Sequence, residues 1–91
     1  MHRLFSILSH MEKTHAPHRY RLIFAQNMRQ IRRLKELSQE ELAFSANISK
    51  TYVCEIERGS RAISIDVMGQ IADALEMPLE EMLKQDLLPI K

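Results

Sequence analysis

Glycine, proline and cysteine are scarce in this chain of 91 residues, and tryptophan is absent. Two glycines and three prolines provide too little turn punctuation for a many-stranded sheet, so long helices are the expected elements. The single cysteine, Cys54, excludes a disulfide within the chain. This thiol could sense oxidants, but no second cysteine is present to resolve an oxidised form, and we expect it to be inert.

The chain also lacks the patterns of membrane proteins, secreted proteins and enzymes. No signal peptide or apolar run of membrane length is present, so we expect a cytoplasmic protein without a membrane partner. The spacing of the four histidines does not suit a compact helical metal site, and Glu80 and Glu81 are helix neighbours that point in different directions. No nucleophile with a matching base and no phosphate-cradling glycine loop is visible. We therefore predict no metal, no cofactor and no catalysis.

The charge is weak overall but unevenly distributed. A formal net charge of +1 is too small for the field of the whole molecule to identify nucleic acid as the partner. Six of the 13 lysines and arginines nevertheless fall between Arg19 and Lys35, whereas acidic residues gather between Glu76 and Asp86. The sequence thus has a basic front and an acidic tail.

Size and periodicity indicate one small domain preceded by an arm. Residues 1–17 show no sustained pattern, and we predict an N-terminal arm there, with the domain over residues 18–91. From residue 18 to residue 37, apolar side chains recur mostly at steps of three and four, which indicates a first helix.

A capping box predicts the start of a second helix. Ser38 offers its hydroxyl as an N-cap, and Glu41 stands three residues later, where its carboxylate can reach back to the N–H of the cap. This helix is expected to end at about Ala46. Asn47 follows, and asparagine is one of the few residue types besides glycine that tolerates a left-handed backbone, so we predict a tight turn.

Three further helices are expected after this turn. Ser49 caps the helix 50–58, which stops at Gly59. An apolar stripe follows a serine cap in the segment 64–75, and a short helix is predicted over 79–84 because a proline precedes it. Five helices and no strand result, so the predicted fold is all-α.

The second and third predicted helices have the pattern of a helix-turn-helix. Ala43 is small where two helices that cross at a steep angle must touch. The face expected to be buried is apolar and comprises Leu42, Ala46, Ile48, Val53 and Ile56. The outward face comprises Lys50, Thr51, Tyr52, Cys54, Glu55 and Arg58. Cationic groups and hydroxyls on one outward face suit phosphates and base edges.

This joint pattern resembles the phage repressor and Cro-like helix-turn-helix family, which includes the controller proteins of restriction-modification systems. The resemblance runs from about Phe24 to Leu83, and residues 31–32, 37–43, 48–53, 56–59, 71–72 and 75 carry it. It implies a five-helix lambda-repressor-like DNA-binding domain. Glu36 and Asn47 depart from the family pattern, which often has glycine at both turns.

The resemblance also implies which residues meet double-stranded DNA. Gln39, at the start of the second helix, would contact a phosphate. Glu55 would either accept a hydrogen bond from a cytosine amine or repel phosphates and sharpen specificity. Arg58 and Arg61 are candidates for contacts with the DNA backbone, with solvated charges as the alternative. The full predicted set is Ser38, Gln39, Ser49, Lys50, Thr51, Tyr52, Glu55, Arg58 and Arg61.

Arg32 and Glu57 have a different implied role. In resembling proteins an arginine of the first helix pairs with a glutamate at the end of the third helix, inside the domain. We therefore expect Arg32 and Glu57 to form a structural ion pair that does not touch DNA.

An excess of apolar residues near the end of the chain predicts a homodimer. The helix 79–84 and the residues around it carry more apolar side chains than a small monomer core requires. Pairing there would place two recognition helices about one turn of DNA apart, on a pseudo-palindrome. The tail could instead fold back over its own core. The predicted interface comprises Met77, Leu79, Met82, Leu83 and Leu87.

The function that follows is sequence-specific binding of an operator by a homodimeric transcriptional regulator, either a repressor or an activator. The alternative is an antitoxin-like protein-interaction module, in which the arm or the acidic tail grips an unidentified partner protein and DNA binding is secondary. A stable complex with another protein would favour the alternative.

Overall fold

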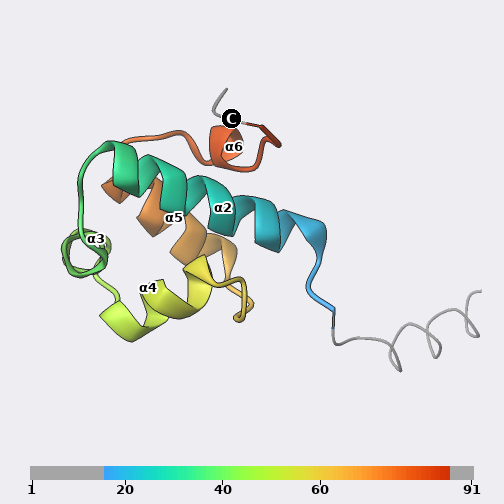
Figure 1. The fold of residues 1–91 in the computed structure, drawn as a ribbon, viewed down its shortest axis with the longest axis horizontal. Coiled ribbons are helices and arrows are strands. Elements are labelled where there is room, and N and C mark those ends of the chain that lie inside the picture. The colour runs from blue at the N-terminus through green and yellow to red at the C-terminus, as the bar shows by residue number, and fades with distance from the viewer. Residues whose placement is uncertain (1–15, 87–91) are drawn as a thin grey trace, which may run out of the picture.

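The computed structural model describes residues 16–86, and within this range the chain forms five helices and no strand. The predicted all-α fold is confirmed. Most of the predicted arm (residues 1–15) and Leu87 of the predicted interface lie outside the described residues. No helix between residues 16 and 86 is long and apolar enough to cross a membrane. The helices in Figure 1 are α2 (Arg19–Leu34), α3 (Gln39–Ala46), α4 (Lys50–Glu57), α5 (Ile65–Ala74) and α6 (Leu79–Met82).

Serine N-caps start three of these helices. The hydroxyl of Ser38 accepts from the Glu41 N–H at 2.9 Å, and the Glu41 carboxylate accepts from the Ser38 N–H at 2.7 Å, so the predicted capping box is formed. The serines before α4 and α5 each accept a backbone N–H at 3.0 and 3.1 Å. Each cap satisfies an N–H that has no partner within the helix, and so fixes where the helix begins.

Two residues with left-handed backbone make the sharp turns on either side of α3. Glu36 has a φ of 59° and Asn47 a φ of 61°, in the region that glycine adopts most readily. Glu36 ends the helical path, so α2 stops at Leu34 although the apolar spacing continues to Leu37. Both turns therefore have a conformation typical of glycine, formed here by other residue types.

The helix α6 is shorter than the sequence predicts, because it ends at Met82 instead of at about Lys84. A buried side chain of α2 explains the difference. The amide nitrogen of Asn27, Nδ2, donates to the carbonyl oxygens of Met82 and Lys84, each at 2.8 Å. These carbonyls are satisfied without a further helical turn, and the carboxamide holds the end of α6 against α2.

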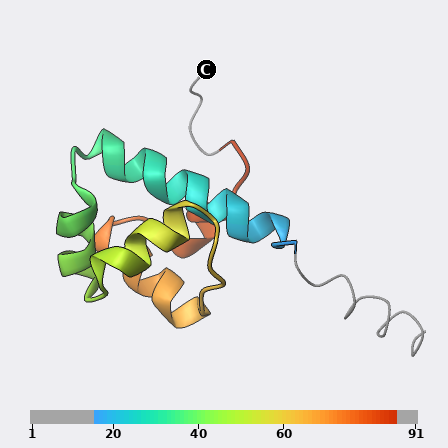
Figure 2. The ribbon, with the colours of Figure 1, turned by 60° about the horizontal axis from the view of Figure 1, so that its bottom comes forward.

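The helix α2 is central, and elements distant in sequence pack on opposite sides of it. In Figure 1, α4 lies below α2 and α6 lies above it. Figure 2 shows α3 at one end of α2, with α4 running from α3 along α2. All five helices, or the residues that cap them, supply core side chains. The fully buried large side chains are Phe24, Met28, Leu42, Val53, Ile56, Ile71, Leu75 and Met82.

Met82 departs from its predicted place in a dimer interface. Its side chain is fully buried within a single chain, in the same cluster as Phe24 and Leu75. A side chain without exposed area has no surface to give to a second chain. The apolar residues near α6 thus divide between the core and the surface, a division that hydrophobicity alone does not reveal.

Candidate nucleic-acid interface

The helices α3 and α4 form the predicted helix-turn-helix. Ala43 and Ala46 of α3 are buried in the same core cluster as Val53 and Ile56 of α4, and small alanine side chains let two packed helices approach closely. The turn is stabilised locally, because the N–H of Ile48 donates to the carbonyl oxygen of Ala43 at 3.0 Å. The buried packing on this side fixes which face of α4 remains available to a ligand.

The available face of α4 begins with polar side chains at its N-terminus. Ser49, Lys50 and Thr51 are all exposed, and Tyr52 is half-buried. The first N–H groups of a helix carry partial positive charge, which adds to the charge of Lys50. This end of α4 therefore offers a cation, hydroxyl groups and backbone donors to an anionic, hydrogen-bonding surface, which is the chemistry of a DNA groove.

Arg61 folds over the middle of this face. Its Nη1 donates to Oε1 of Glu55 at 2.8 Å, and its guanidinium carbon lies 4.9 Å from the centroid of the Tyr52 ring. Three residues predicted separately as DNA contacts thus form one cluster. The pairing offsets the negative charge of Glu55, which reduces its repulsion of a phosphate.

The structure brings Arg32 and Glu57 together inside the domain. Nε and Nη2 of Arg32 donate to the two carboxylate oxygens of Glu57 at 2.6 and 3.1 Å, and the exposed fraction of the Glu57 side chain is 4%. Nη1 of Arg32 donates to the carbonyl oxygen of Leu37 at 2.7 Å. The forked geometry ties α2 to the end of α4 and to the segment before α3.

Gln39 lies at the start of α3, but its carboxamide turns toward α4. Its Nε2 donates to Oε1 of Glu57 at 3.0 Å, and its Oε1 accepts from Sγ of Cys54 at 3.1 Å. The residue as a whole is half-buried. Neither contact was foreseen from the sequence.

Two arginines of the basic front also hold the end of α4. Nη1 of Arg29 donates to the carbonyl oxygen of Glu57 at 2.8 Å, and Nε of Arg21 donates to that of Gly59 at 3.2 Å. The clustering of charge in the sequence pointed to a basic surface, yet gave no sign of these partners. Both arginines place positive charge at the negative end of the α4 dipole, beside exposed Arg58.

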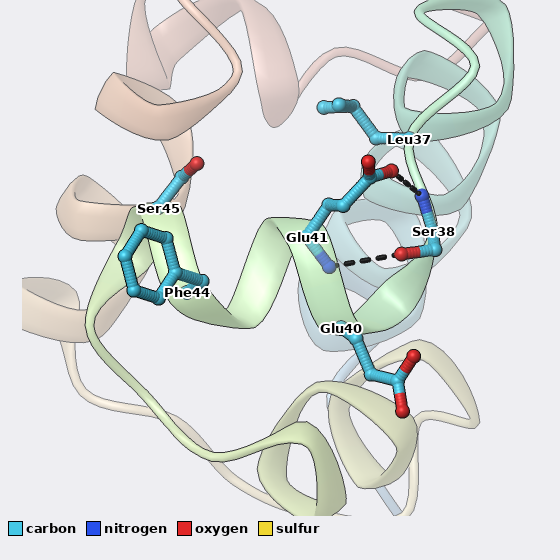
Figure 3. A pocket seen from close by; sticks show the side chains of 6 residues that line it. All are labelled: Leu37, Ser38, Glu40, Glu41, Phe44 and Ser45. Atoms are coloured by element: carbon cyan, nitrogen blue, oxygen red, sulfur yellow. Dashed lines mark hydrogen bonds between the residues drawn. The ribbon is translucent and has the colours of Figure 1, made fainter.

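A separate hollow beside α3 has the opposite chemistry (Figure 3). Its volume is about 650 Å³, and the Phe44 ring at its edge is 89% exposed. The hollow contains two carboxylates and no basic side chain, which makes it unsuited to DNA. The candidate interface therefore excludes the carboxylates of this hollow and comprises the α4 face and the N-terminal end of α3, where Ser38 lies at the rim of the hollow. The lining residues are Leu37, Ser38, Glu40, Glu41, Phe44 and Ser45.

The described part of the predicted dimer interface lies around α6. Met77, Leu79 and Leu83 are half-buried, and each packs partly on the core while keeping some exposed surface. These three residues form a small apolar surface, which we call the α6 surface.

Comparison with known proteins decides the family. A helix-turn-helix family model matches residues 28–82, which is more than half of the chain and includes both helices of the motif. The chain belongs to this family of DNA-binding regulators. Within the family, it is 44% identical over 64 residues to control protein C.BamHI of Bacillus amyloliquefaciens, a match that covers 69% of this chain and 79% of that relative. Control protein C.SmaI of Serratia marcescens is 33% identical over 61 residues, covering 67% of this chain and 73% of the relative.

Solved structures of family members have the same fold. The restriction-modification controller protein C.AhdI from Aeromonas hydrophila superposes with a TM-score of 0.67 at 35% identity, covering 71% of this chain and 98% of that one. C.Esp1396I bound to a 25 base pair operator site superposes with a TM-score of 0.65 at 33% identity, covering 70% of this chain and 88% of that one. The predicted resemblance to controller proteins is confirmed.

Proposed function

We propose that this helix-turn-helix regulator binds a pseudo-palindromic operator in double-stranded DNA as a homodimer and thereby controls transcription. The observation that carries the proposal is the exposed N-terminal half of α4, where Lys50 and Thr51 project from a buried scaffold. An α-helix fits the major groove, and its side chains there can meet base edges. We infer that the protein acts in the cytoplasm, where its DNA lies, and catalyses no reaction.

Each element supplies a different kind of contact in this proposal. Lys50 and Thr51 read base edges, because they occupy the exposed start of the recognition helix. Ser38, Gln39 and Ser49 meet phosphates at the N-termini of α3 and α4, where free N–H groups favour anions.

Tyr52 and Glu55, which form a cluster with Arg61, follow the base-reading residues along α4. Exposed Arg58 and Arg61 contribute positive charge toward the DNA backbone. Glu55 holds Arg61 on Tyr52 and penalises operator sequences that bring a phosphate or a base acceptor too near its carboxylate.

Dimerisation through the α6 surface supports binding to two half-sites. The relative C.Esp1396I has been solved on an operator site, and a symmetric dimer matches a site of two related halves. Leu79 and Leu83 provide exposed apolar area next to the core.

Selection of bound sequences from a random duplex pool tests the proposal. We expect enrichment of a pseudo-palindrome whose half-sites lie about 10 base pairs apart, centre to centre. Affinity for it should fall steeply between about 50 and 200 mM salt, because Lys and Arg contacts release counterions. Failure to enrich any sequence, together with a stable complex with a protein partner, would favour the antitoxin-like alternative.

A further inference from the structure

Four side chains from three helices form one continuous network beside the start of α3. Arg32 of α2 holds both oxygens of Glu57, Glu57 accepts from Nε2 of Gln39 at 3.0 Å, and Gln39 accepts from Sγ of Cys54 at 3.1 Å. Arg32 and Glu57 are buried, whereas Gln39 and Cys54 lie at the edge of the network and are half-buried. The network thus leads from the core to the candidate interface.

The chemistry of the neighbours fixes which way round the Gln39 amide lies. An ionised carboxylate only accepts hydrogen bonds, so the NH2 group of the amide must face Glu57. The oxygen end then faces Cys54 and accepts from its thiol, which is the better pairing because sulfur is only a weak acceptor of an N–H. With the amide turned round, its carbonyl oxygen would face the Glu57 carboxylate, which is also an acceptor, and its NH2 group would face the thiol hydrogen.

This orientation determines what Gln39 can offer to DNA. One of the two N–H groups on the amide nitrogen donates a hydrogen bond to Glu57, and among the described residues the other has no partner. The oxygen is occupied by Cys54. A phosphate approaching the N-terminus of α3 therefore meets an N–H donor together with the free backbone N–H groups, and not an oxygen that would repel it.

We propose that Cys54 and Glu57 are positioning residues, which hold the Gln39 carboxamide so that its free N–H points to a DNA phosphate. The proposal rests on the proposed operator binding and assigns to Cys54 a role on the buried side of the interface. Without the thiol, the amide can rotate, and its ordering must accompany each binding event. Loss of such ordering is expected to weaken binding by about 2- to 10-fold.

Neutralising one phosphate at a time distinguishes a role in positioning the Gln39 amide from a general loss of folding stability. Operator duplexes carry one uncharged methylphosphonate at a time, and each is titrated with the unaltered protein, with Gln39→Ala and with Cys54→Ala. At one phosphate in each half-site, neutralisation should weaken the unaltered protein and leave Gln39→Ala unaffected. Cys54→Ala should lose part of the sensitivity to that same phosphate, whereas Cys54→Ser should regain it, because a serine hydroxyl also donates to the amide oxygen.

Two controls complete the experiment. Thermal melting of each variant measures any change in stability, and Phe44→Ser, which alters a side chain that is 89% exposed in the acidic hollow, should leave both binding and melting unchanged. A further loss on adding Cys54→Ala to Gln39→Ala would show that the thiol acts by another route and would overturn the proposal. Equal losses by Cys54→Ala on charged and neutralised duplexes would overturn it as well. If neither the unaltered protein nor any variant binds an operator, the proposed function itself fails.

Discussion

Arg32 and Glu57 show how one buried pair can serve fold and site at once. Both charges are removed from water, and each recovers its hydrogen bonds from the other and from neighbouring groups. Because these neighbours belong to three helices, the pair fixes the relative positions of α2, α3 and α4.

Glu57→Ala should therefore destabilise the domain. The substitution leaves the Arg32 guanidinium buried with only the Leu37 carbonyl as partner, and breaking a buried pair in this way costs about 3–5 kcal/mol. Urea denaturation followed by circular dichroism measures the change, with exposed Glu40→Ala as the control, expected to change stability by less than about 0.5 kcal/mol. An unchanged unfolding midpoint for Glu57→Ala, with altered sequence preference, would assign Glu57 to DNA instead.

The left-handed residues provide a second test at the residue scale. Glu36→Gly should stabilise the protein by about 0.5–1 kcal/mol, because a side chain is unfavourable at a φ of 59° and glycine is not. Asn47→Gly should raise the free energy of unfolding by a smaller amount, since asparagine tolerates the left-handed region. Gln26→Gly, at an exposed position within α2, should instead lose about 1 kcal/mol. A loss at position 36 as large as that at position 26 would contradict the assigned backbone.

Among the elements, α6 depends most on contacts made outside itself. It has only four residues and no side-chain N-cap, so its place is set by the burial of Met82 and by the two hydrogen bonds from Asn27. A helix of this length is not stable alone in water.

Asn27→Ala should loosen α6 and lower the stability of the whole domain by about 2 kcal/mol, because two carbonyl groups lose their partner. Hydrogen exchange should rise first in residues 79–84, before it rises in α4. Gln26→Ala, one position away on the exposed side of α2, serves as the control and should alter neither quantity. Equal exchange in the two variants would show that Met82 alone holds the helix.

The helices were predictable because their signals are local. Serine caps, apolar spacing and the tolerance of Asn47 for left-handed backbone all act within a few residues, and they placed α3 and α4 to within one residue. The end of α6 was missed because it is determined by Asn27, which lies 55 residues earlier in the chain than its partner Met82. The contacts of Gln39 with Cys54 and of Arg29 with Glu57 likewise require the tertiary fold.

For the whole molecule, the proposed dimer depends on which apolar residues remain at the surface. Leu83→Glu should weaken the dimer while the chain still folds, because Leu83 is only half-buried. Met82→Glu should unfold the chain, because its side chain has no exposed area. Light scattering at micromolar concentration, with circular dichroism as the folding control, distinguishes the two outcomes.

DNA binding by the Leu83→Glu variant should fall with dimerisation. A monomer holds one half-site and loses the gain from linking two binding events, which amounts to about 10²- to 10⁴-fold in affinity. A monomeric unaltered protein that protects a single half-site would refute the dimer and leave the helix-turn-helix intact.

The central claim is that the N-terminal half of α4 reads DNA sequence, and the most direct test compares Lys50→Ala and Thr51→Ala on the selected operator and on random duplex DNA. Both side chains are exposed, so neither substitution should alter the fold. The account predicts that at least one variant loses about 1–3 kcal/mol of binding free energy on the operator and clearly less on random DNA. Equal losses on the two duplexes, or no loss on either, would contradict it.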